Sequence, residues 1–456
     1  MTTHETLSVI EQELSHFDPE VRLNALDRLA GYLDSGKLSV QPVKNVANMH
    51  CHTFFSYNAY GFSPSALAWL AKKSGYRLMG IVDFDVLDGV DEFLNACDML
   101  GVCGSAGIET RNFLPEFASL EINSPGEPGV YYNMGIGFST GQVPSEAKRI
   151  LADLHLRSDR RNRAIIDRVN DFLDPILVDY EKDVLPLTPA GSPTERHIVQ
   201  AYVRRVESVI PDPSVFWTDK LGLPPSQIVD YLKDPPAFNN IVRSKLMKRG
   251  GVGYVQPNPD SFPVVDQLYK LATLSGALPC ATWLDGFSEG EKVFPEILEL
   301  LISKGAVTLN IVPDRNWNVP DGTLRTVKLQ KLHEVVQLAE SMDLPLNIGT
   351  EMNTYGNKLI DDLDVPELAP FRQAFLDGAY YIYGHTILNR ALGLGYQSKW
   401  AKTHFPNRKG RNEFYTKAGY SIPPGRYSIQ KLKEYSPQSL PVEILAAFKE
   451  RENSNV

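Results

Sequence analysis

The stretch Met49-His50-Cys51-His52-Thr53 directly follows Val46-Ala47-Asn48. Side chains two positions apart on a strand point to the same face. His50 and His52 are therefore expected to leave the end of a strand together, with Cys51 on the other face. Two neighbouring imidazoles supply half of a typical transition-metal site. This stretch predicts a metal centre at the end of a strand.

The overall composition is that of a globular protein, with 456 residues, 43% hydrophobic and 22% charged. The net charge of -9 disfavours binding of a nucleic-acid duplex. The four cysteines show no CxxC spacing, which is typical of a reducing compartment. The N-terminus is polar, and no run of about 18 apolar residues occurs. We expect a cytoplasmic protein without a membrane-spanning segment, and nothing indicates its oligomeric state.

Short apolar stretches alternate with helical patterns from residue 46 onward. Ser63 as an N-cap and Pro64 at the first helical position mark one helix start clearly. The alternation favours an α/β protein with a parallel barrel of seven to eight strands over an open sheet. The predicted strands cover residues 46–50, 78–82, 102–108, 130–138, 277–282, 306–312, 346–349 and 379–383.

The chain divides into five predicted segments. Residues 1–44 form an N-terminal helical appendage with a turn at Asp18-Pro19, and residues 45–142 form the first part of the barrel. Residues 143–255 are helix-rich and charged, with Pro-rich turns, which indicates a helical insertion. Residues 256–390 complete the barrel, and residues 391–456 form a C-terminal extension that ends in a helix at 441–451.

Carboxylates join the two histidines at the carboxyl ends of the predicted strands. Asp83, Glu109 and Glu351 each follow an apolar stretch. Barrel active sites are built on that end of the strands. A mixed set of imidazole and carboxylate ligands suits Zn²⁺, Mn²⁺ or Fe²⁺.

The motifs together resemble those of the PHP (polymerase and histidinol phosphatase) superfamily of metal-dependent phosphoesterases. The resemblance is nearest to the branch of nucleotide and oligonucleotide phosphoesterases with a helical insertion, and it covers roughly residues 46 to 355. It implies a distorted parallel barrel of PHP type. The matching segments are His50-Cys51-His52-Thr53 for His-x-His-[ST], Ile81-Val82-Asp83-Phe84-Asp85 for Thr-Asp-His-Asp, Gly107-Ile108-Glu109 for Gly-x-Glu, Thr194-Glu195-Arg196-His197-Ile198-Val199 for Thr-Arg-x-x-[IL]-Ala, Tyr254-Val255 for Tyr-Val, and Gly349-Thr350-Glu351-Met352-Asn353 for Gly-Ser-Asp-x-His.

The chain departs from the family pattern where the family carries further metal-binding histidines. Family members usually hold three metals. The residues at the positions of one of these metals are kept, so the resemblance implies about one divalent ion per chain. The kept ligands are His50, His52, Glu109 and Glu351, and the substituting residues are Asn58, Phe84, Asn133, Thr282 and Asn353.

The candidate ligands have alternative interpretations. His50, His52 and Glu109 bind a metal or form a hydrogen-bonded structural network. Glu351 is a fourth ligand or an exposed loop carboxylate. Asp83 is a ligand, a proton acceptor or a partner that orients an imidazole.

The remaining candidates surround these ligands. Arg196, in the predicted insertion, binds a substrate anion or is a solvated helix charge, and its position predicts that the insertion acts as a lid over the strand ends. Arg111 is a weaker anion-binding candidate. His385, at the end of the predicted strand 379–383, is a possible replacement for a lost ligand. The ring of Phe84 is expected to face the site.

The leading functional hypothesis is a metal-dependent hydrolase, most simply a phosphoesterase of a small phosphorylated metabolite or nucleotide. A metal-activated water would attack, Asp83 or Glu351 would accept its proton, and Arg196 would neutralise the phosphate. One alternative is a barrel without catalytic activity that binds a metabolite or a protein. Another is a one-metal hydrolase or lyase that acts on a non-phosphate substrate. All three readings leave the identity of the substrate and of the metal open.

Overall fold

The computed structural model describes residues 3–448, and a seven-stranded sheet in the order β1 to β7 forms its centre. Neighbouring strands run parallel, except that β4 is antiparallel to both β3 and β5. The predicted parallel barrel is therefore a mixed one. The strands are β1 (Lys44–Cys51), β2 (Tyr76–Phe84), β3 (Cys103–Phe113), β4 (Val130–Ile136), β5 (Leu278–Trp283), β6 (Thr308–Ile311) and β7 (Leu346–Ile348).

The sheet is nearly closed by a contact between β1 and the chain that follows β7. Cys51 and Glu351 form a parallel bridge. The His52 N–H donates to the Glu351 carbonyl over 2.7 Å, and the Glu351 N–H donates to the His50 carbonyl over 2.8 Å. Gly349 permits this approach, because a Cβ there would lie 2.4 Å from the His50 Cβ. The closure places the loop of Glu351 directly beside the His-x-His stretch.

Two strand predictions are corrected by the structure. Residues 379–383 lie inside helix α15 (Arg372–Leu392) and not in a strand. Tyr380, Tyr381, Ile382 and Tyr383 are all buried, so this helix has no polar face there and its apolar run looks like a buried strand. The strand predicted to stop near Glu109 continues to the end of β3, because residues 110–113 pair with β4.

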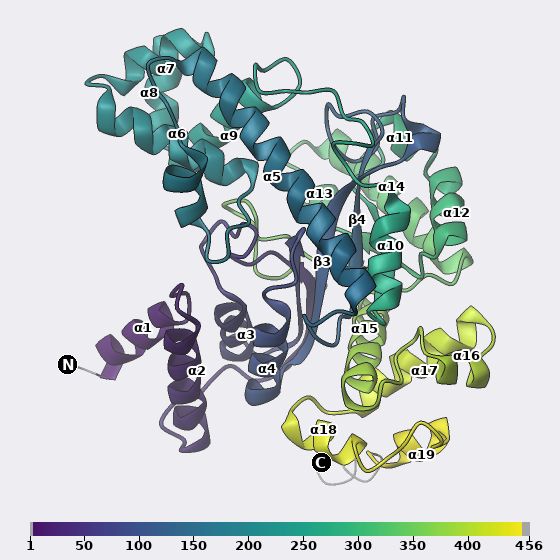
Figure 1. The fold of residues 1–456 in the computed structure, drawn as a ribbon. Coiled ribbons are helices and arrows are strands. Elements are labelled where there is room, and N and C mark those ends of the chain that lie inside the picture. The colour runs from purple at the N-terminus through teal and green to yellow at the C-terminus, as the bar shows by residue number, and fades with distance from the viewer. Residues whose placement is uncertain (1–2, 449–456) are drawn as a thin grey trace.

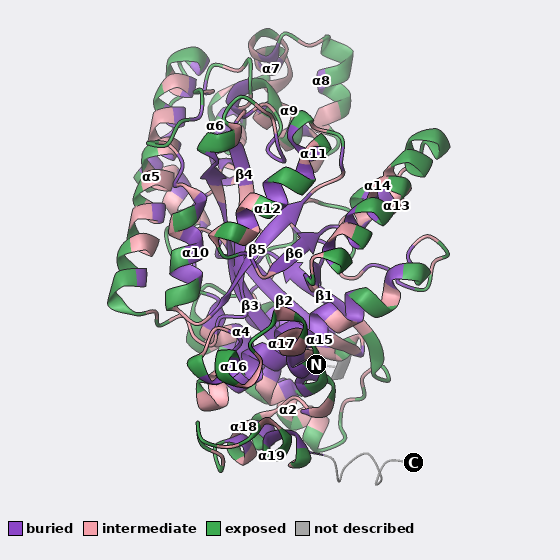
Figure 2. Ribbon diagram, turned by 90° about the vertical axis from the view of Figure 1, so that its right-hand side faces the viewer, coloured by how far each residue is buried: buried purple, intermediate pink, exposed green. Residues whose placement is uncertain are grey.

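Helices cover the outside of the sheet (Figure 1). The predicted helix start at Ser63 is confirmed, since the Ser63 Oγ accepts from the Ala66 N–H over 3.0 Å. Figure 2 shows the buried strands enclosed by helices with exposed outer faces. The covering helices are α3 (Pro64–Lys73), α4 (Val90–Leu100), α10 (Val265–Leu274), α11 (Glu289–Lys292), α12 (Phe294–Lys304), α13 (Asp314–Trp317) and α14 (Gly322–Ser341), with short turns η1 (Pro115–Phe117) and η4 (Ala369–Phe371).

The segment predicted as an insertion is helical and has a hydrophobic cluster of its own, built around Tyr202, Trp217 and Phe238. The long helix α5 runs from these helices down to the sheet (Figure 1). The boundaries of the five segments and the lid function remain predictions. The helices are α5 (Ser145–Leu173), α6 (Glu195–Val209), α7 (Pro213–Leu221), α8 (Pro225–Leu232) and α9 (Pro235–Met247), with the short turns η2 (Tyr180–Val184) and η3 (Leu185–Leu187).

Helices also form both ends of the described chain. At the N-terminal end, α1 (Thr3–Glu13) and α2 (Pro19–Asp34) are separated by the predicted turn at Asp18. The predicted helix 441–451 corresponds to α19 (Pro441–Ala446), and residues 449–451 lie outside the described residues. The other C-terminal helices are α16 (Lys399–His404), α17 (Arg408–Ser421) and α18 (Arg426–Leu432).

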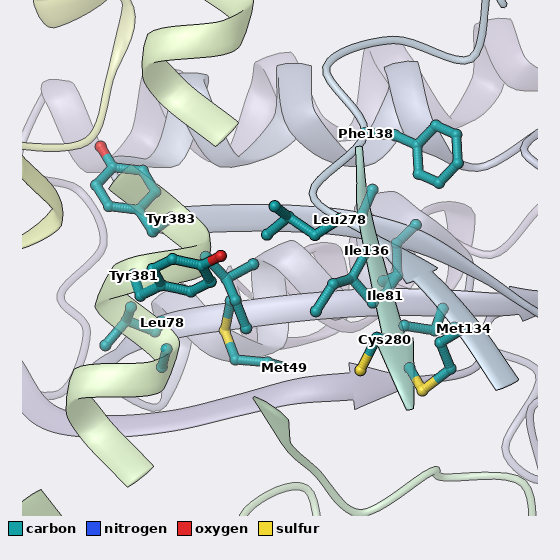
Figure 3. Close-up of a cluster of buried hydrophobic side chains, with 14 of the residues drawn as sticks. Met49, Leu78, Ile81, Met134, Ile136, Phe138, Leu278, Cys280, Tyr381 and Tyr383 are labelled. Carbon is teal, nitrogen blue, oxygen red and sulfur yellow. The ribbon is translucent and has the colours of Figure 1, made fainter. Parts of the chain in front are cut away.

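The largest hydrophobic core lies where α15 packs against β1, β3 and β7. Figure 3 shows Tyr381 and Tyr383 of α15 with Met49 and Leu78 from the strands. Within residues 3–448, no helix is both long enough and apolar enough to cross a bilayer. The rigid sheet leaves its strand ends free to carry polar groups.

Candidate metal centre

Two imidazoles and one carboxylate converge at the end of β1. The Glu109 Oε2 lies 3.6 Å from the His50 Nε2 and 3.3 Å from the His52 Nε2. All three side chains are buried, at 1%, 0% and 5% exposure for His50, His52 and Glu109. Their ligand atoms lie within 4.8 Å of one another, so a single ion can contact all three. The three residues predicted as the ligand core are therefore brought together.

A hydrogen-bonded chain behind His52 fixes the ring. The Ser56 Oγ donates to the Asp83 Oδ1 over 2.6 Å, and it lies 3.3 Å from the His52 Nδ1. Because the Ser56 proton points to Asp83, the Ser56 oxygen accepts from the His52 Nδ1–H. The neutral ring then carries its lone pair on Nε2, the nitrogen that faces Glu109. Asp83 acts through Ser56, as carboxylates behind metal-binding histidines do.

His50 is oriented in the same sense by two asparagines. Its Nδ1 lies 3.2 Å from the Asn310 Oδ1, which also accepts from the Asn347 Nδ2 over 2.8 Å. An amide oxygen only accepts, so the His50 Nδ1 carries a hydrogen. The Nε2 lone pair of the neutral ring is again directed at Glu109. The two histidines thus have matching tautomers set by unrelated neighbours.

Among the described residues, the buried Nε2 atoms of His50 and His52 face only the Glu109 carboxylate, and neither makes a hydrogen bond of good geometry. Unpaired buried polar atoms are rare in folded proteins and indicate a missing ligand. Burial raises the pKa of Glu109, but the adjacent imidazoles lower it more, and the net pKa is about 2. Burial lowers the pKa of His50 and Glu109 raises it, for a net pKa above its usual 6.5. The centre therefore favours positive charge, and its donor set fits a divalent transition metal.

Glu351, the predicted fourth ligand, is paired with an arginine. Its Oε2 lies 2.8 Å from the guanidinium of Arg315 on α13. Burial raises the pKa of Glu351, and the charge of Arg315 lowers it to below 4.5 overall. The backbone at Glu351 has a φ of 63°, and Met352 has a φ of 58°. Non-glycine residues seldom adopt this left-handed region, and such strain is common at functional sites. Whether Glu351 binds a metal remains a prediction.

A cavity of about 480 Å³ opens over the centre. His50, Glu109, Phe84 and Glu351 lie in its wall, together with residues from α5, α6 and α9. Neither His52 nor Asp83 belongs to the wall formed by the described residues. The cations of the wall are Arg111, Arg196, Arg243, Lys248 and Arg315, and its carboxylates are Glu109, Glu195 and Glu351.

The cations of the wall differ in their partners. Arg111 pairs with Glu127 at 3.0 Å and lies 3.5 Å from Glu195, and Arg243 and Lys248 each lie 2.9 Å from Glu195. These three serve a buried ion-pair network, so the weaker candidate Arg111 is already engaged.

Arg196 has only neutral partners in the part of the chain that the structure describes. It donates to the Thr354 Oγ1 over 3.0 Å and to the Asn240 Oδ1 over 3.1 Å, and it lies over the ring of Tyr57. Its charge remains available for an anion.

His385 is not placed near the centre. It lies in α15, fully buried, with its Nε2 3.0 Å from the Gly137 carbonyl and its Nδ1 accepting from the Tyr396 N–H over 2.9 Å. Both nitrogens are occupied, and burial lowers the pKa of His385 to about 4. The idea that His385 replaces a lost ligand is wrong, because residues 379–383 continue as a helix and never reach the strand ends.

The ring of Phe84 faces the centre, as predicted. It stacks on His52 with ring centroids 4.3 Å apart and lines the cavity. Thr282 and Asn353 also line the cavity. Asn58 donates instead to the His52 carbonyl over 2.9 Å, and Asn133 accepts from Tyr269 over 2.8 Å.

Three contributors were missed in the sequence. Ser56 lies four residues after His52, but only the fold brings it to Asp83. Asn310 had a visible signal, since it is a polar residue close to the carboxyl end of the predicted strand 306–312. Arg315 lies on the four-residue helix α13, and no periodic pattern marks it.

The comparisons with known proteins name no family. No protein-family model matches the sequence, and no curated protein matches it. Among solved structures, the chain is similar to an amidohydrolase from Chromobacterium violaceum that holds bound sulfate and no metal, at 14% identity and a TM-score of 0.47, over 73% of this chain and 96% of that one. It is also similar to a candidate metal-dependent phosphoesterase from Bifidobacterium adolescentis, at 17% identity and a TM-score of 0.45, over 72% and 97%. Both TM-scores lie below 0.5, so we base the function on the site alone.

Proposed function

We propose that this chain is a metal-dependent hydrolase of a small phosphoester, with one divalent ion held by His50, His52 and Glu109. The observation that carries the proposal is the pair of unpartnered Nε2 atoms directed at one buried carboxylate. Both rings are locked in the tautomer that presents a lone pair. Apart from Glu109, no described group is placed to pair with these nitrogens, whereas the buried polar groups of a purely structural network are usually hydrogen-bonded.

The substrate is proposed to be anionic because of the charges that face the cavity. Arg196 has no carboxylate partner among the described residues, and Arg315, whose side chain is 42% exposed, lines the same cavity. Planar guanidinium groups match the geometry of phosphate oxygens. The cavity volume of about 480 Å³ suits a small metabolite or a nucleotide.

The proposed hydrolysis assigns a separate role to each of a few residues. A divalent cation held by His50, His52 and Glu109 would act as a Lewis acid and activate a water at neutral pH. Asp83 holds His52 in orientation through Ser56, and it does not itself line the cavity. Glu351 is the carboxylate proposed to accept a proton, because it is ionised at neutral pH and lies in the cavity wall. Arg196 binds the anionic group and stabilises the charge that develops on it.

Residues of α5, α6 and α9 are proposed to act as the lid of this site. Ser158, Thr194 and Ser244 line the cavity from these helices, opposite residues of the barrel. Covering the site excludes bulk water and strengthens the charge interactions inside it. Arg196 reaches from α6 to Thr354, which links the lid to the loop of Glu351.

A substrate panel tests the proposal. The protein is loaded with Zn²⁺, Mn²⁺ or Fe²⁺ and assayed on aryl phosphate monoesters and diesters, and in parallel on aryl amides and lactones. We expect phosphoester hydrolysis that disappears in His52→Ala. Arg196→Met should lower kcat/KM for phosphoesters, while Arg160→Met, which changes an exposed arginine on α5, should not. Activity on amides or lactones without activity on phosphoesters would replace the phosphoesterase with a different hydrolase.

A further inference from the structure

We infer that Arg315 is a positioning residue that holds Glu351 away from the metal and so keeps the metal site open for substrate. The inference rests on the proposed metal site. Glu351 has two competing partners, the Arg315 guanidinium and a cation at His50, His52 and Glu109. Only the first contact is made in the structure, at 2.8 Å.

The backbone of Glu351 is fixed next to the ligands. Its N–H donates to the His50 carbonyl, its carbonyl accepts from the His52 N–H, and its φ of 63° is imposed by this bridge. The side chain therefore starts within a short distance of the centre whatever its rotamer. His50, Glu109 and Glu351 all line the same cavity.

In the structure, the carboxylate of Glu351 is not part of the group formed by His50, His52 and Glu109, whose ligand atoms lie within 4.8 Å of one another. Zinc sites with four protein ligands are structural, whereas catalytic sites use three and leave a position for water or substrate. Glu351 as a fourth ligand would close the site, and its carboxylate would also add negative charge opposite an anionic substrate. Arg315 prevents both effects, since it neutralises Glu351 and points it along the cavity wall.

Arg315 is itself held by contacts that do not involve the centre. Its carbonyl accepts from the Lys328 Nζ over 3.1 Å, and that amine pairs with Asp285 at 2.9 Å. Its side chain remains 42% exposed and lines the cavity. A substitution at Arg315 should therefore leave the fold intact.

Metal affinity, measured by competition with a coloured chelator for Zn²⁺, tests the inference without any substrate. We expect Arg315→Met to bind Zn²⁺ at least tenfold more tightly than the native chain. Arg325→Met, which removes an exposed arginine from α14, should change the affinity less than twofold. Arg325 makes only a loose pair with Glu367 at 3.9 Å.

A second variant separates recruitment of Glu351 from the simple loss of a positive charge. In the Arg315→Met background, Glu351→Gln should abolish the gain, whereas in the native background Glu351→Gln should change affinity less than threefold. A gain that persists in the double variant would reflect charge alone and would overturn the inference.

A loss of tenfold or more for Glu351→Gln in the native background would show that Glu351 already binds the metal, which also overturns the inference. A native chain that binds no Zn²⁺ would instead refute the proposed function. If the native chain does bind Zn²⁺, an Arg315→Met variant whose Zn²⁺ affinity is no higher than the native one refutes the inference about Arg315.

Discussion

The hydroxyl of Ser56 donates a 2.6 Å hydrogen bond to the carboxylate of Asp83, and this bond decides which nitrogen of the neighbouring His52 is free. Ser56→Ala should remove the acceptor for the Nδ1–H and leave the ring free to change tautomer. Partners behind metal-binding histidines are typically worth 10- to 100-fold in affinity, so we expect about a tenfold weaker metal complex. Chelator competition measures it, with the exposed Ser303→Ala on α12 as the control. An unchanged affinity would mean that another group orients His52.

Phe84 stacks on His52 at the place where the related motif has a histidine. Phe84→His alone should leave the metal content at about one ion per chain, because one new imidazole is too few ligands for a second ion. The double change Phe84→His with Asn353→His places two imidazoles on the same cavity wall and should add metal. Mass spectrometry of the metal content compares Phe84→His, Asn353→His and the double variant. A second ion in the Phe84→His single variant would contradict the match of Phe84 to the histidine of the Thr-Asp-His-Asp motif.

Gly349 lies where β7 approaches β1 most closely. In Gly349→Ala the new Cβ would lie 2.4 Å from the His50 Cβ and 2.5 Å from the His50 nitrogen. The backbone must shift, and we expect a loss of about 1–3 kcal/mol in the free energy of unfolding. Gly322→Ala is the matched control, because a Cβ there meets nothing within 4 Å. Equal stability of the two variants in urea titrations would show that the β1–β7 contact is looser than described.

His385 gives a pH dependence of stability that is independent of the metal site. Burial lowers its pKa to about 4 in the fold, against 6.5 in its ordinary state. The folded protein thus binds fewer protons, so this contribution is present above pH 6.5 and is lost as the pH falls toward 4. His385→Gln should flatten the decline in the free energy of unfolding between these values. Its metal affinity should stay native, whereas a large loss would restore His385 as a ligand.

The convergence of His50, His52 and Glu109 could be predicted because it depends on local periodicity. Alternation along β1 places His50 and His52 on one face, and Glu109 follows a recognisable apolar run. Periodicity gave a wrong strand prediction at residues 379–383, because a helix that is buried on all sides has the same continuous apolar pattern as a buried strand. This wrong strand prediction also placed His385 at a strand end, whereas the structure places it inside α15.

The orientation of the ligands could not be predicted, because it depends on contacts between distant parts of the chain. Asp83 reaches Ser56 across 27 residues, and Arg315 reaches Glu351 across 36. Each partner is an ordinary polar residue in its own segment. The reversed direction of β4 had no signal either, because strand direction is set by the path of the connecting chain and not by side-chain periodicity.

The proposed one-metal centre at His50, His52 and Glu109 is best tested by the metal content of the purified protein. The protein is purified in buffer with Zn²⁺, Mn²⁺ and Fe²⁺, dialysed extensively and analysed by mass spectrometry. We expect about one divalent ion per chain in the native protein and almost none in either His50→Ala or His52→Ala. His333→Ala, a histidine on α14 outside the site, should keep the native value. Two or three tightly bound ions per chain, or an ion that is still bound in His52→Ala, would refute a single metal centre held by His50, His52 and Glu109.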